Sequence, residues 1–218
     1  MARGIRLEHG DIVVRLANVR DAKVLKQLIL ENRSWLRPWE ATHPHAPNNF
    51  DVKGQLRLLR GYYKEGLCIP FVIEYRNEVV GQLNVSSIIH GSLSSGVLGY
   101  WIAPNVAGLG ITPTAVALVC DYLFEHVGLH RIEIDIRPEN ISSLRVVQKL
   151  GFRYEGLKER FIHINGAWRD HYVFALTSEE VGVGLTKRWM SGAIVEAKYP
   201  FSTKTVKHTA RDNREMGS

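Results

Sequence analysis

Residues 98–152 read LGYWIAPNVAGLGITPTAVALVCDYLFEHVGLHRIEIDIRPENISSLRVVQKLGF, and this stretch decides the fold. It begins as an apolar strand, turns at Gly108 and Gly110, and continues as a helix opened by Pro113. A strictly alternating strand follows, and Asn140 then caps a helix that a Gly-Phe pair ends. This order predicts a mixed α/β sheet, with free backbone N–H groups at each helix start.

Shorter signals on both sides extend the sheet and add helices. Asn165-Gly166 and Arg76-Asn77-Glu78 each join two apolar segments as a hairpin. The expected strands cover residues 12–16, 71–75, 79–85, 97–102, 131–137, 161–164 and 171–176. Helices are expected at 22–30 after a capping Asp21, from Asn49 or Asp51 towards Gly66, at 112–127, at 140–150, and from Ser178 to Met190. Together they predict one α/β sheet of seven strands with helices on both faces.

Length and composition favour one globular domain. The chain has 218 residues, of which 45% are hydrophobic and 23% charged. No apolar run approaches the ~20 residues of a membrane span, and the first residues lack the apolar stretch of a secretory signal, so a cytoplasmic protein is expected. Cys68 and Cys120 lie in apolar surroundings without metal-ligand spacing, which predicts buried free thiols.

The formal charge of +6 is unevenly distributed. Residues 197–218 hold five basic side chains against two acidic ones. We therefore expect a folded domain at 11–178, a C-terminal helix at 179–192 and a flexible basic tail at 193–218. The tail is a candidate for weak contact with RNA, the ribosome or another acidic partner, and a merely solvated end is the alternative. A function in nucleic-acid binding alone is disfavoured, because the aromatic residues do not interleave with the basic run.

The glycine-containing turn has a chemical interpretation. Free N–H groups at a helix start attract phosphate, and glycine lets a ligand approach the backbone closely. The segment Ala107-Gly108-Leu109-Gly110-Ile111-Thr112, directly before Pro113, provides both features. A tight turn without a ligand would have the same sequence, so the loop alone leaves both interpretations open.

Two motifs at matching spacing connect this loop to a known family. Tyr100-Trp101-Ile102-Ala103-Pro104 with Gly110, and Asn140-Ile141-Ser142-Ser143 with Lys149-Leu150-Gly151-Phe152, resemble the acetyl-CoA-binding core of the GNAT N-acetyltransferases. The resemblance implies the GNAT fold, in which a single mixed sheet is splayed in the middle, here between the strands at 97–102 and 131–137. It also implies acetyl-CoA as the acetyl donor, without a metal.

Several positions depart from the family pattern. Ala107 stands where Gln or Arg is expected, Thr112 where Gly or Ala is expected, and Thr114 and Gln148 each replace Glu. The loop would then hold a pyrophosphate more by backbone N–H groups and the helix dipole than by side chains. By resemblance, acetyl-CoA contacts Ile102, Ala103, Pro104, Gly108, Gly110, Ile111, Thr112, Pro113, Thr114, Asn140, Ser143 and Val147.

Acetyl transfer to an amine needs a group that accepts the amine proton and a group that protonates the leaving thiolate. Asp135, five residues before Asn140 where related enzymes carry a glutamate, is the candidate acceptor, directly or through water. Ser143 is the candidate donor by resemblance, because Val147 occupies the position of the tyrosine that many members use. The structural alternatives are an ion-paired Asp135 and a Ser143 that only fills the first turn of its helix.

The histidines give no comparable signal. His130, His163 and His171 fall in or near strands, and His43 and His45 lie in a loop rich in Trp and Pro. Their spacing does not suit zinc, and we expect packing or surface positions for all five.

Across residues 16–176 the chain is similar to the RimJ-type ribosomal-protein alanine N-acetyltransferases. The likeness rests on the Ser34-Trp35-Leu36-Arg37-Pro38-Trp39 loop, on Gly99-Tyr100-Trp101, and on Asn165-Gly166 with Trp168-Arg169-Asp170. It implies an acceptor groove walled by Trp35 and Trp39, with Glu40 against the incoming ammonium and Tyr100 nearby. Two tryptophans packed in the core are the alternative.

These observations predict an acetyl-CoA-dependent N-acetyltransferase that acts on the N-terminal alanine of a ribosomal protein. The same chemistry on a small amine, such as an antibiotic, polyamine or amino acid, is the first alternative. A non-catalytic acyl-CoA-binding or ribosome-associated module is the second. The sequence is compatible with a monomer and with a homodimer, and no membrane association is expected.

Overall fold

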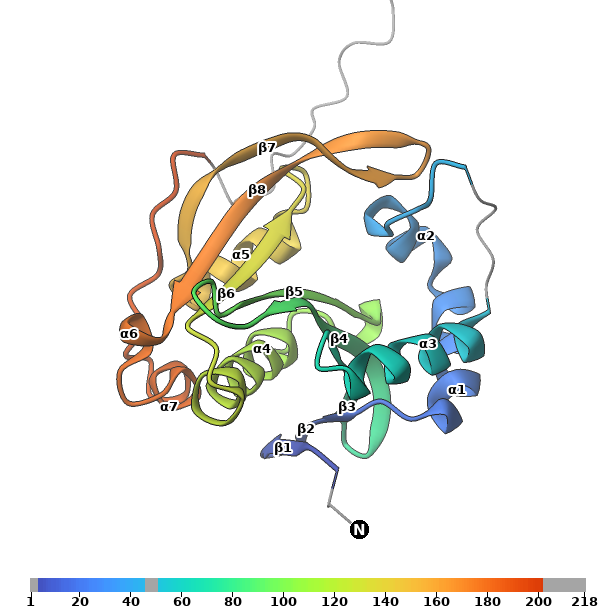
Figure 1. The fold of residues 1–218 in the computed structure, drawn as a ribbon, viewed down its shortest axis with the longest axis horizontal. Coiled ribbons are helices and arrows are strands. Elements are labelled where there is room, and N and C mark those ends of the chain that lie inside the picture. Colours follow the sequence, from blue (N-terminus) through green and yellow to red (C-terminus); the bar gives the residue numbers. More distant parts are fainter. Residues whose placement is uncertain (1–3, 46–50, 202–218) are drawn as a thin grey trace, which may run out of the picture.

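The computed structural model describes residues 4–45 and 51–201 (Figure 1). Its strands form one mixed sheet in the order β1-β2-β3-β4-β5-β6-β8-β7. Every neighbouring pair is antiparallel except β5 and β6, which run parallel. The strands are β1 (Arg6–His9), β2 (Ile12–Leu16), β3 (Ile69–Tyr75), β4 (Glu78–Ile89), β5 (Ser95–Ile102), β6 (Arg131–Ile136), β7 (Arg153–Ile164) and β8 (Ala167–Thr177).

The sheet has eight strands where the sequence predicted seven. The additional strand is β1, which pairs with β2 across a turn in which Gly10 has a φ of 56°. Its residues, Arg-Leu-Glu-His, are mostly exposed, so they carry no alternating apolar pattern. An edge strand of this kind is stabilised by its pairing with β2, and the local sequence gives no signal for it.

Helices cover both faces of the sheet, as expected. They are α1 (Ala22–Glu31), α2 (Arg33–Leu36), α3 (Val52–Lys64), α4 (Ile111–Tyr122), α5 (Ile141–Lys149), α6 (Ser178–Val181) and α7 (Leu185–Met190). Alternation along β3 shows the two faces: Val72 packs with the buried residues of α1 and α3, whereas Phe71 and Ile73 pack in the larger cluster that includes α4 and α5. We call these the α1/α3 face and the α4/α5 face.

Two expectations about helices were wrong in detail. The helix predicted from Ser178 to Met190 is two short helices, because Gly182 and Gly184 between them have φ values of 59° and 105°. Asp21 makes no capping hydrogen bond to α1; its carboxylate accepts from the N–H of Asn18 instead. Asp51 does cap α3, accepting from the N–H of Gly54 at 2.8 Å, while Asn49 lies outside the described residues.

The chain continues to pack against the folded domain after α7, as far as Phe201, although the sequence predicted a flexible tail from residue 193. Residues 193–201, here called the C-terminal strap, run back along α5 and the sheet. The Tyr199 hydroxyl donates to the Phe152 carbonyl at 2.8 Å, and the Phe201 ring stacks on Tyr172 with centroids 4.1 Å apart. Most of the basic side chains of the predicted tail lie in residues 202–218, outside the described part of the chain.

The core is apolar, and both cysteines belong to it. Cys68 and Cys120 are free and buried, as predicted. Burial raises the pKa of both thiols, so neither is a reactive thiolate near neutral pH. In the described part of the chain, no helix is long and apolar enough to cross a membrane.

Candidate active site

The sheet opens between its two parallel strands, as the family resemblance implied. β5 and β6 pair only where Ser95–Val97 faces Arg131–Glu133, although both strands continue beyond that point. On the other side of β5, the N–H of Ala103 donates to the Val80 carbonyl at 2.8 Å. Because antiparallel residues alternate, the neighbouring Ile102 directs its N–H and carbonyl away from β4 and into the opening.

A cavity of about 170 Å³ lies in this opening and is lined from both faces of the sheet. Ile134 and Ile136 point into the core on the α4/α5 face, so Asp135 between them points to the α1/α3 face. Tyr100 packs against the α4/α5 core, and both Tyr100 and Asp135 line the cavity. Groups from opposite faces therefore meet between the strands.

On the α4/α5 face, a tyrosine and a serine form a hydroxyl pair. The Tyr100 and Ser143 hydroxyl oxygens are 2.8 Å apart. Ser143 is placed by the start of α5, where the Asn140 side chain accepts from its N–H at 3.1 Å, which confirms the predicted cap. Burial raises the pKa of Tyr100, and the hydrogen bond with Ser143 offsets only part of that rise. Tyr100 therefore stays protonated near neutral pH, and its hydroxyl can donate to Ser143.

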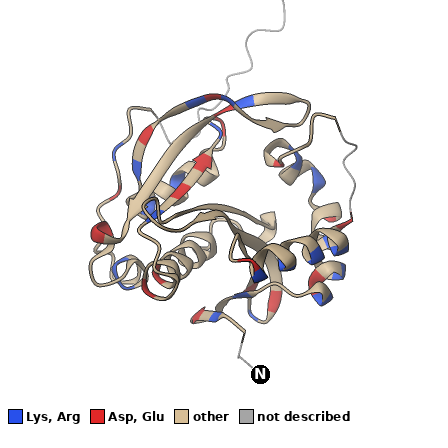
Figure 2. Ribbon diagram, in the orientation of Figure 1, with Lys and Arg blue, Asp and Glu red and all other residues tan. Residues whose placement is uncertain are grey.

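On the α1/α3 face, Asp135 is ion-paired. Lys158 Nζ on β7 lies 3.1 Å and 3.4 Å from its two carboxylate oxygens, and the aspartate side chain is only 6% exposed. Burial raises the pKa of Asp135, and Lys158 lowers it by less, so the net shift is upward. Figure 2 shows acidic residues on β6 and both signs of charge along β7.

Three residues of this site were missed or not assigned a role by sequence reasoning. Lys158 and His171 face each other across β7 and β8, on the side of the sheet that carries Asp135. Arg137 follows β6; its guanidinium donates to the Pro38 carbonyl at 2.7 Å and lies 5.4 Å from the Trp39 ring centre. Strand alternation could have grouped Lys158 with His171, but the contact of Arg137 with a loop near residue 38 has no sequence signal.

Aromatic side chains form the rim of the cavity. Trp35 donates its indole N–H to the Ile102 carbonyl at 3.1 Å, and Trp39 lines the cavity. They are 38% and 36% exposed, so neither is a core residue. Glu40, predicted to meet an ammonium group, instead forms an ion pair with Arg33.

The rim loop is tied to the far end of the sheet. Ala41 pairs with Ile164 as an isolated β-bridge, and the N–H of Thr42 donates to the His163 carbonyl at 2.8 Å. Figure 1 shows the long β7–β8 hairpin arching towards the region of α2. The rim is thereby held over the opening by contacts between distant parts of the chain.

The glycine loop has the features of a phosphate cradle. Gly108 and Gly110 have φ values of 84° and 81°, and a Cβ atom at either would meet nothing within 4 Å. Gly110 precedes the first turn of α4 and offers no side-chain cap, so the N–H groups of Ile111 and Thr112 have no intrahelical partner. Open space over free N–H groups suits the pyrophosphate of acetyl-CoA.

Several other residues predicted to contact acetyl-CoA have buried side chains. Pro104 is exposed where β5 ends, but the side chains of Ala103, Ile111, Pro113 and Val147 are buried. Thr114 is also buried: its hydroxyl donates to the Gly110 carbonyl at 2.9 Å and accepts from the Trp189 indole at 3.0 Å. The side chain of Thr114 therefore fixes the loop and α7 to α4.

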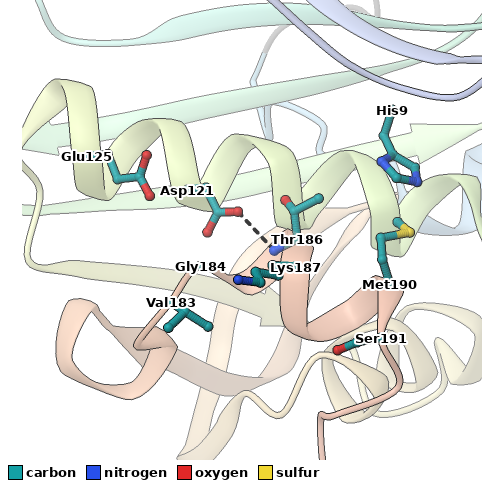
Figure 3. A pocket seen from close by; sticks show the side chains of 9 residues that line it. All are labelled: His9, Asp121, Glu125, Val183, Gly184, Thr186, Lys187, Met190 and Ser191. Carbon is teal, nitrogen blue, oxygen red and sulfur yellow. Dashed lines mark hydrogen bonds between the residues drawn. The ribbon is translucent and has the colours of Figure 1, made fainter.

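A larger cavity, of about 570 Å³, lies elsewhere, between β1, α4 and α7 (Figure 3). Of its two acidic residues, Asp121 and Glu125, Asp121 accepts from the N–H groups of Leu185 and Thr186 at 2.6 Å and 2.9 Å. No backbone gap or paired proton donor comparable to that between β5 and β6 lines it. Among the described residues, no group of three His, Cys, Asp or Glu side chains is placed to hold a metal ion.

Comparison with known proteins agrees with this geometry. Residues 11–153 match the acetyltransferase (GNAT) domain family. The chain is 32% identical to the probable N-acetyltransferase YjcK of Bacillus subtilis, over 80% of this chain and 98% of the relative. It is 31% identical to the [ribosomal protein uS5]-alanine N-acetyltransferase of Escherichia coli, over 81% and 92%.

Solved structures give the same result. Mycobacterium smegmatis RimJ in complex with CoA-disulfide superimposes with a TM-score of 0.80 at 35% identity, covering 87% of this chain and 94% of that one. The ribosomal-protein-S5-alanine acetyltransferase of Vibrio fischeri superimposes with a TM-score of 0.73 at 31% identity, covering 81% and 98%. The chain therefore belongs to the GNAT family and is an acetyl-CoA-dependent N-acetyltransferase.

Proposed function

We propose that the protein acetylates the α-amine of an N-terminal alanine on a ribosomal protein, in the cytoplasm. Support comes from the relatives with more than 30% identity that carry this activity in their names, from E. coli and V. fischeri. The observation that carries the proposal is the cavity between β5 and β6, because it joins a proton donor on one face of the sheet to a carboxylate on the other.

The α4/α5 face suits the donor substrate. Acetyl-CoA supplies a thioester carbonyl and a thiolate leaving group. The N–H groups at the start of α4 can bind its pyrophosphate, and the N–H of Ile102, which points into the opening, can pair with its pantetheine arm, with Asn140 at the cavity. Ser143 and Tyr100 hold protons that the thiolate can accept.

The α1/α3 face suits the acceptor. Trp35 and Trp39 form a partly exposed rim through which a chain terminus can reach the cavity. Behind the rim, the carboxylate of Asp135 supplies the negative charge towards which the amine proton moves. An extended peptide terminus is compatible with this rim, since only its first residue has to enter.

An acceptor screen tests the proposal. Peptides that begin with Ala, Ser or Met are compared with polyamines, amino acids and aminoglycosides, and CoA release is followed with a thiol reagent and mass spectrometry. We expect kcat/KM to be highest for alanine-terminated peptides that match ribosomal N-termini. Reaction with small amines alone would exclude the peptide acceptor and leave the acetyltransferase activity in place.

A further inference from the structure

His171 occupies a position that a packing role does not explain. It lies on β8, is only 3% exposed, and lines the cavity together with Asp135 and Trp39. It stands opposite Lys158 on β7, and Asp135 stands opposite Val173, two residues further along β8. All three polar side chains thus project from the same face of the sheet, the face assigned to the acceptor.

The hydrogen bonding of His171 fixes its tautomer. Nδ1 lies 3.0 Å from the carbonyl oxygen of Arg169. Because a carbonyl only accepts, Nδ1 carries the proton, and the neutral ring keeps a lone pair on Nε2. The described residues give Nε2 no hydrogen bond, while the Phe161 ring holds the imidazole edge-on with centroids 6.0 Å apart. A base with an available lone pair therefore borders the cavity.

Asp135 is less available than His171. Both of its oxygens are within hydrogen-bond distance of Lys158, so protonation of the carboxylate would disrupt an ion pair in a nearly buried place. His171 loses no interaction on taking a proton at Nε2. The negative charge of Asp135 nearby would stabilise the imidazolium that forms.

Burial keeps His171 neutral at pH 7, although charged groups surround it. Burial lowers the pKa of His171, and this outweighs the carbonyl of Arg169 and the carboxylate of Asp135, which raise it. Arg137 lowers it further, and Glu139 raises it. Lys158, across the strand pair, adds a positive charge that is already paired with Asp135. The net pKa lies below the usual 6.5.

We propose that His171, which the proposed function did not use, accepts the amine proton through Nε2, with Asp135 as a positioning and charge-stabilising residue. The nitrogen lone pair of the acceptor forms the new C–N bond, and the carbonyl π electrons move to oxygen. The proton on the now cationic nitrogen passes to Nε2. The carbonyl re-forms, the C–S bond breaks with its electron pair on sulfur, and the thiolate takes a proton from Ser143, which takes one from Tyr100. The imidazolium then releases its proton to solvent and Tyr100 regains one from solvent, so all three groups return to their starting states. This step rests on the proposed function.

The test compares His171→Gln with His130→Gln, whose histidine is exposed and pairs with Glu179 at a distant surface. For His171→Gln we expect turnover to fall about 100-fold or more, with unchanged melting temperature and CoA affinity. The acid limb of the pH profile of kcat, with an apparent pKa below 6.5 in the unmodified enzyme, should disappear. The His130→Gln variant should keep the turnover rate and the acid limb of the unmodified enzyme.

Asp135→Asn separates the two candidate bases. Because Asp135 raises the pKa of His171, its removal should move the acid limb to lower pH without abolishing it. A limb that survives in His171→Gln and vanishes in Asp135→Asn would assign the proton to Asp135 and overturn the inference.

A measurement without any acceptor keeps this inference distinct from the proposed function. Nitrogen–proton NMR correlation of the imidazole should show the Nδ1–H tautomer for His171 and its titration below pH 6.5. The opposite tautomer would refute the role of Nε2. Failure of every alanine peptide, with turnover of another amine, would refute the acceptor assignment alone, and the same variants would then be assayed on that amine.

Discussion

The phenol beside Ser143 comes from Tyr100 on β5 and not from the helix that carries Ser143. Where many family members carry a tyrosine on the helix, this chain has Val147, which is fully buried. The phenol comes instead from β5, and its oxygen lies 2.8 Å from the Ser143 hydroxyl. The family resemblance implies a place for Tyr100 on the acceptor side, but its hydroxyl lies next to Ser143, the predicted proton donor, on the α4/α5 face.

We predict that Ser143→Ala lowers turnover at least 10-fold while CoA affinity is unchanged, because the thiolate loses its proton donor and the capping N–H of residue 143 remains. Tyr100→Phe should have a smaller effect in the same direction. Steady-state kinetics and calorimetry of the two variants and of the double variant measure this. Strictly additive effects on the activation free energy would show that the two hydroxyls do not act together.

Asp21 carries a second prediction, on stability. It is 8% exposed and accepts bonds of 2.9 Å and 2.8 Å from the Arg15 guanidinium and one of 2.7 Å from the Asn18 N–H. Burial alone would raise the pKa of Asp21, but these bonds outweigh it and hold the pKa below 3.8. Folding therefore favours the ionised carboxylate. The contribution of Asp21 to the free energy of unfolding is present above about pH 4 and is lost as the pH falls through the lowered pKa of the folded state.

We expect Asp21→Asn to reduce the free energy of unfolding by about 3 kcal/mol at pH 7, because Arg15 loses a partner in a nearly buried place. Asp11→Asn is the matched control, since the pair of Asp11 with Arg76 is 60% and 71% exposed and should be worth less than about 1 kcal/mol. Urea unfolding from pH 7 down to pH 3 should show the difference shrinking below pH 4. Equal losses in the two variants would contradict this account.

The sequence predicted some residues of the site and missed the roles of others. Asp135, Asn140 and Ser143 were found because each belongs to a local motif, and all three line the cavity. An ion pair of Asp135 was one of the alternatives considered, but its partner Lys158 was not predicted. His171 was assigned to packing or the surface, since its chemistry arises from neighbours on two other strands.

Among the elements, α4 shows how two glycines of the same conformation can differ in role. Gly110 begins the helix with a φ of 81°, and Gly128 closes the π-helical turn after it with a φ of 76°. A Cβ atom at either residue would meet no neighbour within 4 Å, so backbone strain is the only local cost. Only the first glycine borders the proposed phosphate cradle.

We predict that Gly110→Ala and Gly128→Ala lose similar stability, about 1–2 kcal/mol each, because each puts an L residue in the left-handed region. CoA affinity should fall at least several-fold for Gly110→Ala only, where the loop shifts to relieve the strain. Thermal unfolding and calorimetry with CoA provide both readouts. Equal losses of affinity would remove the loop from the binding site.

Element boundaries that depend on distant contacts were the less predictable ones. The hairpin turns at Arg76-Asn77 and Asn165-Gly166 were confirmed, because positive φ values at both positions of such turns favour Asn and Gly. β1 and the break between α6 and α7 were missed. β1 depends on β2 for its pairing. At the break, Gly182 and Gly184 have positive φ values, and Asp121 of the distant α4 accepts from the first N–H groups of α7.

At the scale of the molecule, the C-terminal strap closes the core next to the site. Tyr199 and Phe201 join Tyr154, Tyr172 and Phe174 in one aromatic cluster on the α4/α5 face. The backbone of Ala197 and the side chain of Gln148 on α5 are also hydrogen-bonded. The strap thus belongs to the fold, although its composition resembled that of a tail.

We predict that a chain ending after Gly192 is less stable than one ending after Phe201 by about 3 kcal/mol or more, because two aromatic side chains leave a packed cluster. The chain ending after Phe201 keeps every described contact and is therefore the reference for this comparison. Tyr199→Phe, which removes only the 2.8 Å bond to Phe152, should cost about 1 kcal/mol. Identical urea midpoints for both truncations would refute a structural role for the strap.

From the sequence alone came the order of seven of the eight strands, the glycine turn, the caps at Asp51 and Asn140, and the family, because periodicity, caps and turn residues act over a few neighbouring positions. Only the tertiary structure decided that Trp35, Tyr100, Asp135, Ser143 and His171 border one opening. Those residues come from α2, α5 and three strands, and they meet because β5 and β6 separate after three paired positions. Where two strands part is set by the packing of helices on both faces, which no local stretch of the chain encodes.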